Sequence, residues 1–97
     1  MKNDIVQFIE ELVSLAKEVE DDVTLSLGIY NVTLGIMEYS NKYIPRSVQL
    51  RIYILCCQGI IKLSDDEKLI TKLRIDLNKM LEEVNDGIYT TSVSDVS

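Results

Sequence analysis

The chain has 97 residues, 46% of them apolar, with 10 basic and 16 acidic side chains and a net charge of −6. Its length predicts one domain with a modest core. The acidic balance argues against a nucleic-acid partner and against adhesion to anionic lipid through charge alone. Because there is no histidine, the commonest general base and the commonest metal ligand are both absent.

The first predicted element is an amphipathic helix over residues 4–19. Polar residues interrupt its apolar pattern, so neither a signal peptide nor a transmembrane segment is expected. Asp21 or Asp22 is expected to cap the element that follows. The apolar residues recur three and four positions apart, which predicts that they face the core: Ile5, Phe8, Ile9, Leu12, Leu15, Ala16 and Val19.

Residues 23–43 carry two competing patterns. One is a helical stripe, and the other is a strand-like alternation of apolar with small or polar residues through residue 29. No Asn-Gly or Asp-Gly turn supports a hairpin, so we favour the helix and leave the strand open. This helix would be apolar on more than one side, which predicts that it is largely buried. Its stripe is Val23, Leu27, Tyr30, Leu34 and Met37.

A third helix is predicted over residues 46–61, after a loop that contains Pro45. Proline suits this place because the first turn of a helix does not need its N–H. Gly59 is expected to allow another helix to approach closely. Cys56 and Cys57 are adjacent and point about 100° apart on a helix, so they are poorly placed to bridge each other. We expect reduced thiols packed in the core, with a redox pair or a soft-metal site as the weaker alternative.

The fourth helix has the clearest start in the chain. Ser64 stands three residues before Glu67, which predicts a capping box in which each side chain accepts the other residue's backbone N–H. Apolar residues then recur at helical spacing as far as Val84. The Asn-Asp-Gly sequence that ends in Gly87 is expected to stop the helix.

Four helices of similar length joined by short loops predict an all-α fold. We expect an antiparallel up-down-up-down four-helix bundle over residues 1–87. The last residues, 88–97, are polar and β-branched and predict a short flexible C-terminal tail. Ile88 and Tyr89 are large enough to anchor that tail against the bundle.

The polar residues do not form a recognisable catalytic set. The adjacent acidic pairs are interpreted as solvated helix surface, and most tyrosines as core or boundary residues, Tyr89 excepted. No enzyme activity, cofactor, metal or small-molecule substrate is therefore expected. A mildly basic zone on this acidic chain is expected to pair with the acidic helices, the alternative being attraction of an acidic partner or a membrane surface: Lys42, Arg46, Arg51 and Lys62.

Residues 44–97 resemble the immunity proteins for class IIa (pediocin-like) bacteriocins, and among them the enterocin A type. The resemblance rests on a proline before the third helix, Pro45, and on a helix entry, Leu63-Ser64-Asp65-Asp66-Glu67-Lys68-Leu69-Ile70. It also rests on a tail that begins Gly87-Ile88-Tyr89 and reaches Asp95. The first half matches only in length, helical pattern and the acidic first loop.

The resemblance implies a cytosolic four-helix bundle that protects the producing bacterium from its own pore-forming peptide. The implied partner is the membrane permease of the mannose phosphotransferase system with bacteriocin bound, which places the protein close to the membrane. The implied partner-binding residues are in the tail: Gly87, Ile88, Tyr89, Thr90 and Val93. The alternative function is a small helical module that binds a soluble cytosolic protein.

Overall fold

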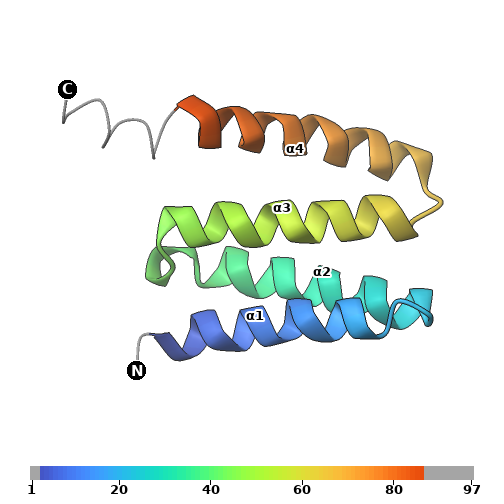
Figure 1. Ribbon diagram of the computed structural model, residues 1–97, viewed down its shortest axis with the longest axis horizontal. Coiled ribbons are helices and arrows are strands. Elements are labelled where there is room, and N and C mark those ends of the chain that lie inside the picture. The colour runs from blue at the N-terminus through green and yellow to red at the C-terminus, as the bar shows by residue number, and fades with distance from the viewer. Residues whose placement is uncertain (1–2, 87–97) are drawn as a thin grey trace.

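The computed structural model describes residues 3–86, and all the regular structure in this range is helical (Figure 1). The fold is therefore all-α, and the strand alternative for residues 23–43 is wrong. Gly87, which is expected to end the fourth helix, and the tail 88–97 lie outside the described residues. The elements are α1 (Asn3–Glu18), α2 (Val23–Tyr39), the short 3-10 helix η1 (Asn41–Tyr43), α3 (Arg46–Leu63) and α4 (Glu67–Asp86).

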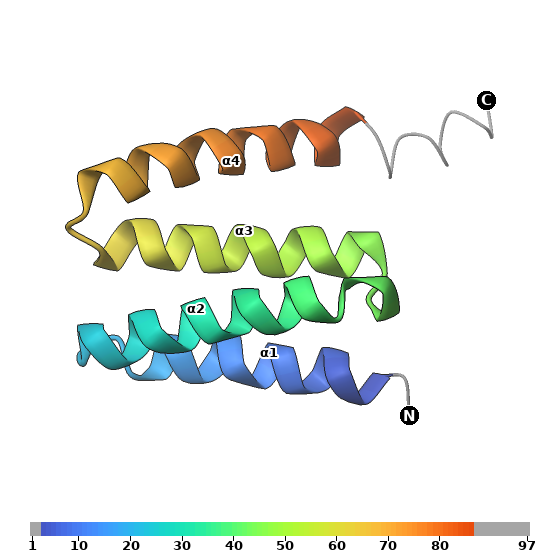
Figure 2. The ribbon, with the colours of Figure 1, turned by 180° about the vertical axis from the view of Figure 1, so that it is seen from behind.

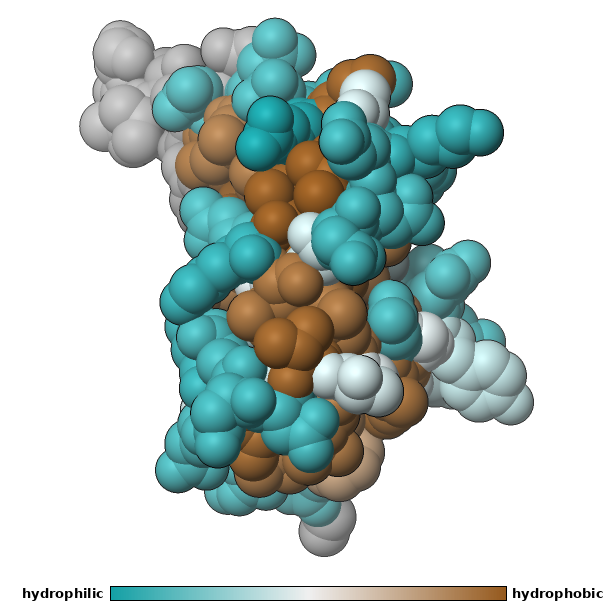
Figure 3. Space-filling model, turned by 90° about the vertical axis from the view of Figure 1, so that its right-hand side faces the viewer, coloured by the Kyte–Doolittle hydropathy of each residue, from teal (hydrophilic) through white to brown (hydrophobic). Residues whose placement is uncertain are grey.

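The four helices lie alongside one another with their connections at alternating ends (Figures 1 and 2). Helices α1, α2 and α3 each pack on the other two. Helix α4 packs extensively on α3 alone, on the side away from α1 (Figure 1). Seen from the end that carries the α1–α2 and α3–α4 connections, apolar surface runs down the middle of the molecule between polar edges (Figure 3). The bundle is thus three mutually packed helices with a fourth attached along one edge.

Helix α1 turns a different part of its apolar stripe to the core than the sequence predicts. Ile9, Val13 and Ala16 are buried, whereas Phe8 and Leu15 keep 48% and 43% of their surface exposed. The predicted core positions of Phe8 and Leu15 are therefore wrong. The reason is that the apolar arc of α1 is wider than the contact with α2 and α3, so its edge remains in solvent.

Two side-chain hydrogen bonds fix the turn from α1 to α2. Asp22 caps α2 as predicted, because its Oδ1 accepts the N–H of Leu25 at 3.1 Å. Buried Ser26 then donates its hydroxyl to the carbonyl of Ala16 at 2.6 Å. That carbonyl lies in the last turn of α1, where a helix leaves its carbonyls without intrahelical partners.

Gly59 brings α3 close to α2, which confirms the close approach expected there. A Cβ atom built on Gly59 would lie 2.6 Å from the hydroxyl oxygen of Tyr30 and nearer still to its ring. Tyr30 is only 1% exposed. The absence of a side chain at Gly59 thus makes the space in which the tyrosine is buried.

The α2–α3 connection is held by one amide side chain. Gln49, in the first turns of α3, donates its Nε2 to the carbonyls of Asn41 and Ile44 at 2.6 and 2.9 Å. Pro45 immediately precedes the first residue of α3, Arg46, as the sequence predicts. The buried Gln49 amide therefore gives the Ile44 carbonyl a partner and adds a second donor to the Asn41 carbonyl, which also accepts the N–H of Ile44.

The predicted capping box between Ser64 and Glu67 is wrong. Helix α3 runs two residues further than predicted, and the N–H of Ser64 donates to the carbonyl of Ile60. That bond uses the donor that Glu67 would have needed. The start of α4 is capped instead by Asp66, whose Oδ1 accepts the N–H of Leu69 at 3.2 Å, while the Ser64 hydroxyl accepts the N–H of Asp66 at 3.1 Å.

The basic zone pairs with the acidic elements, which confirms the intramolecular interpretation for three of its four members. Arg46 bonds Glu83 on α4, Arg51 bonds Glu10 on α1, and Lys62 bonds Glu20 after α1. All three pairs join segments that are distant in sequence. The fourth member, Lys42, lies 5.4 Å above the ring centre of Tyr43.

Candidate functional site: the groove between α2 and α4

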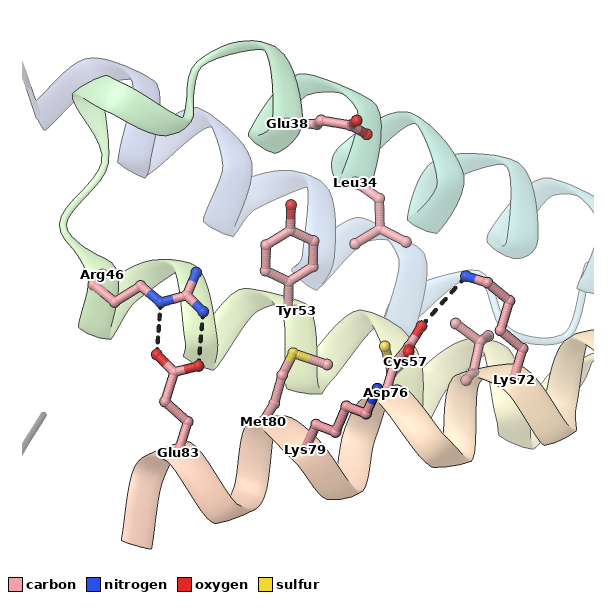
Figure 4. A pocket seen from close by; sticks show the side chains of 11 residues that line it. Leu34, Glu38, Arg46, Tyr53, Cys57, Lys72, Asp76, Lys79, Met80 and Glu83 are labelled. Atoms are coloured by element: carbon pink, nitrogen blue, oxygen red, sulfur yellow. Dashed lines mark hydrogen bonds and ion pairs between the residues drawn. The ribbon is translucent and has the colours of Figure 1, made fainter. Parts of the chain in front are cut away.

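A groove of about 440 Å³ runs between α2 and α4, with α3 as its floor (Figure 4). It exists because α4 packs on α3 without closing against α2. Sites of this size between the helices of a bundle are common places for ligands and partner segments to bind. The lining residues are Leu34 and Glu38 from α2, Arg46, Tyr53 and Cys57 from α3, and Lys72, Leu73, Asp76, Lys79, Met80 and Glu83 from α4.

The floor of the groove is apolar and uncharged. Burial raises the pKa of the Tyr53 phenol, and the nearby carboxylate of Glu38 raises it further. Burial also raises the pKa of the Cys57 thiol, with Asp76 adding in the same direction. Both groups therefore carry their protons at neutral pH. A protonated thiol is a poor nucleophile and a poor metal ligand, so this floor suits contact with apolar groups.

One end of the groove is closed by a bidentate ion pair. Arg46 Nε and Nη2 donate to the two carboxylate oxygens of Glu83, each at 2.8 Å (Figure 4). Arg46 Nη1 also donates to the side-chain oxygen of Gln49 at 3.0 Å. The hydrogen bond from Arg46 lowers the pKa of the Glu83 carboxyl, and the same bond raises that of the guanidinium. This pair ties the start of α3 to the last turns of α4.

The wall formed by α4 presents both charges. Lys72 pairs with Asp76 at 3.3 Å, and Lys79 lies on the same helix between this pair and Glu83 (Figure 4). Glu38 faces them from α2. The described residues contain no group of three or more cysteine, aspartate or glutamate side chains placed to hold a metal ion. The arrangement therefore offers an apolar floor and polar walls for binding an amphipathic segment.

The residues that the resemblance assigns to the partner lie outside the described range: Gly87, Ile88, Tyr89, Thr90 and Val93. The last described turns of α4 contain Glu83, so the chain continues toward Gly87 from the end of the groove that the Arg46–Glu83 pair closes. The groove residues of α4 were not singled out from the sequence. Their amphipathic spacing predicts a helix. It does not predict that α4 packs on α3 and leaves a groove between itself and α2.

Two tyrosines were misassigned to the core or its boundary. Tyr39 is 92% exposed at the end of α2, and Tyr43 is 64% exposed in η1. Tyr39 is the last residue of α2 and Tyr43 lies in the α2–α3 connection, at the same end of the bundle as the last turn of α4 (Figure 1). The sequence signal that could have found them is the polar segment Ser40-Asn41-Lys42 between the two tyrosines. Exposed aromatic side chains are typical of binding surfaces.

Comparison with known proteins finds no matching family model, no matching curated protein and no matching solved structure. Within residues 3–86, no helix combines the length and the apolar character that crossing a membrane requires.

Proposed function

We propose that this chain is a bacteriocin immunity protein, a non-enzymatic protein that protects its own cell from a pore-forming class IIa peptide. It acts in the cytoplasm by engaging the mannose phosphotransferase permease in the membrane after the bacteriocin has bound there. The proposal takes the chain as an antiparallel up-down-up-down bundle over residues 1–87 with a flexible tail over 88–97. Residues 44–97 are the part of the chain whose motifs resemble that family.

The open α2–α4 groove is the observation that carries the proposal. Its floor of Tyr53 and Cys57 is neutral at physiological pH. In each of its two ion pairs, Arg46–Glu83 and Lys72–Asp76, the opposite charges of the partners cancel. Such a lining favours binding a segment of another protein over performing a reaction. The groove reaches the last turns of α4, which directly precede Gly87 in the sequence, and under this proposal the groove and the tail residues bind one partner.

The test is protection of a sensitive bacterium. The chain is expressed in the cytoplasm of a strain that class IIa bacteriocins kill, and survival is measured against a panel of these peptides. Protection against one or a few is expected, and ending the chain after Gly87 should abolish it. Replacing Ile88 and Tyr89 by serine should also abolish it, whereas replacing Ser92 and Ser94 by alanine should not. Immunoblotting verifies equal amounts of each variant.

A module for a soluble cytosolic partner is the second candidate, and the exposed loop aromatics favour it. Tyr39 and Tyr43 present two rings to solvent beside Lys42, which lies over the second ring. Under this function the chain gives no protection against any peptide of the panel. Under the immunity function, replacing both tyrosines by serine leaves protection in place, because the tail supplies the recognition.

A further inference from the structure

A second apolar surface lies on α1 and α2, separate from the α2–α4 groove. We name it the α1–α2 apolar face and define it by Phe8, Leu12 and Leu15 of α1 with Leu25, Ile29 and Val32 of α2. Four of these side chains are about half exposed: Phe8 at 48%, Leu15 at 43%, Leu25 at 48% and Val32 at 55%. Leu12, Leu25, Ile29 and Val32 of this face line a groove of about 430 Å³, and no residue of the face lines the α2–α4 groove.

The composition of α2 makes this exposure unusual. The helix has 17 residues and a single charged one, Glu38, so its sequence predicts burial on more than one side. The bundle covers only the side that holds Tyr30, Met37 and their neighbours. The prediction that α2 is largely buried is therefore wrong for the single chain that the structure describes. The uncovered side is the part of α2 that a partner would bury.

The exposed side of α2 also leaves room for a close neighbour. A Cβ atom built on Gly28 or on Gly35 meets nothing within 4 Å, and both glycines are solvent-exposed. They lie seven residues apart, which is about two helical turns, so they share one side of α2. Small residues on a helix surface let another helix backbone approach closely.

Within residues 3–86, the charged side chains beside this face are negative. Glu11 lies three residues after Phe8 and Glu18 three after Leu15, which makes each a helical neighbour of an exposed apolar side chain. Both are exposed and form no ion pair with any residue that the structure describes. Helix α2 has no basic residue. The one basic residue of α1, Lys17, lines pockets on the α3 side of the helix instead.

We propose that the α1–α2 apolar face binds a cationic amphipathic helix. Apolar side chains of that helix cover Leu12, Leu25 and Val32, and its lysine or arginine side chains reach Glu11 and Glu18. A second copy of this chain would bring the same glutamates against each other, and an anionic lipid surface would be repelled by them. Of the partners that could cover an apolar surface, the negative charge therefore favours a basic helix over a second copy or an anionic membrane. The proposal is independent of the proposed function.

The first test uses the full chain and a synthetic probe. The probe is a peptide of leucine and lysine whose leucines recur three and four positions apart, so that it forms a basic amphipathic helix. Isothermal titration calorimetry measures its binding against two controls, a scrambled peptide of the same composition and a peptide with glutamate in place of lysine. Binding of the first peptide alone is expected, and it should weaken as salt is added. Equal binding of the scrambled peptide would overturn the proposal.

Variants locate the binding surface. Val32→Glu places a charge in the face at an exposed position, and it should weaken binding of the leucine–lysine peptide about tenfold or more. The double variant Glu11→Lys with Glu18→Lys should lose that peptide and gain the glutamate peptide. Ile75→Glu is the matched control, since Ile75 is 51% exposed on α4. The proposal is wrong if Ile75→Glu weakens binding as much as Val32→Glu, or if sedimentation shows a dimer of the unmodified chain that Val32→Glu dissociates.

Discussion

The ring of Tyr30 fills the space that a side chain at residue 59 would need. A Cβ atom on Gly59 would lie 2.6 Å from the tyrosine hydroxyl oxygen and closer to two ring carbons, while the ring itself is 1% exposed. Because the ring is buried in a densely packed core, moving it to admit a methyl group at residue 59 would disturb the contacts that it makes. The junction of α2 and α3 therefore depends on a glycine in the middle of a helix.

Gly59→Ala should destabilise the protein by about 1–3 kcal/mol, because the added methyl group overpacks the Tyr30 site. This loss outweighs the gain of about 1 kcal/mol that alanine brings over glycine inside a helix. Gly28→Ala and Gly35→Ala are the matched controls, since a Cβ at either position meets nothing within 4 Å, and they should stabilise. Urea unfolding measures all three. Equal stability of Gly59→Ala and the two controls would contradict the packing described here.

Ser26→Ala should cost about 1–2 kcal/mol, because it removes the only described side-chain partner of the Ala16 carbonyl in a buried place. Thr33→Val is the control. The hydroxyl of Thr33 donates to the carbonyl of Ile29 four residues earlier in the same helix, and that carbonyl already takes part in the α2 ladder. Thermal unfolding followed by circular dichroism should show the larger loss for Ser26→Ala. A larger loss for Thr33→Val would mean that Ser26 does not hold α1 to α2.

The start of α4 gives a test that separates two capping arrangements. Asp66→Ala should cost about 1 kcal/mol, because the Asp66 carboxylate caps the N–H of Leu69. Glu67→Ala should cost less than Asp66→Ala, since the described structure shows no bond from Glu67 back to Ser64, and Glu67→Gln, which a capping box would also accept, is the control for the loss of charge. If the capping box formed, Asp66→Ala would be mild and Glu67→Ala costly. Denaturant unfolding of Asp66→Ala, Glu67→Gln and Glu67→Ala distinguishes the two outcomes.

The two cysteines should be unreactive in the folded protein. Burial raises the pKa of the Cys56 thiol to about 12 and raises that of Cys57 as well. The native chain should therefore react with iodoacetamide at pH 8 far more slowly than the unfolded chain, and mass spectrometry follows the reaction. The raised pKa values also mean that the contribution of the two thiols to stability is fully present below roughly pH 8.5, the pKa of an unfolded cysteine, and is lost as the pH rises above it. Rapid labelling of both thiols in native protein would contradict their burial.

The sequence predicts the helices well and their outer surfaces poorly. Helical spacing identifies all four helices, and Asp22, Pro45 and Gly59 act where their chemistry predicts. Spacing fixes which residues share a face of a helix, but not which part of a wide apolar face meets a neighbour. Phe8 was therefore predicted inside and is half exposed.

Two other features depended on tertiary structure in the same way. The predicted capping box at Ser64 is absent because α3 extends to Leu63, and the N–H of Ser64 donates to the carbonyl of Ile60 instead of to Glu67. The α2–α4 groove was unpredictable because the periodicity of α4 is the same whether it packs on one helix or on two. The tail residues Gly87, Ile88 and Tyr89 remain a prediction, since they lie outside the described range.

The Arg46–Glu83 pair makes part of the stability depend on pH. The hydrogen bond from Arg46 lowers the pKa of the Glu83 carboxyl in the folded state. A carboxyl whose folded pKa is lowered stabilises the fold above its unfolded pKa, roughly 4, and this contribution is lost as the pH falls through the folded value. The unmodified chain should therefore be more stable than Glu83→Gln at pH 7, and the difference should disappear in acid.

Glu82→Gln is the control for this measurement, because Glu82 is the neighbouring glutamate and is exposed without a described ion-pair partner. Urea unfolding of the three proteins at a series of pH values provides the comparison. The difference between Glu83→Gln and the unmodified chain should be modest and should shrink in concentrated salt, because both partners are partly exposed to solvent. A difference that persisted in acid would show that Glu83 acts through packing and not through its charge. If Glu82→Gln lowered the free energy of unfolding as much as Glu83→Gln, the stabilisation would come from the overall negative charge near the end of α4 and not from the Arg46–Glu83 pair.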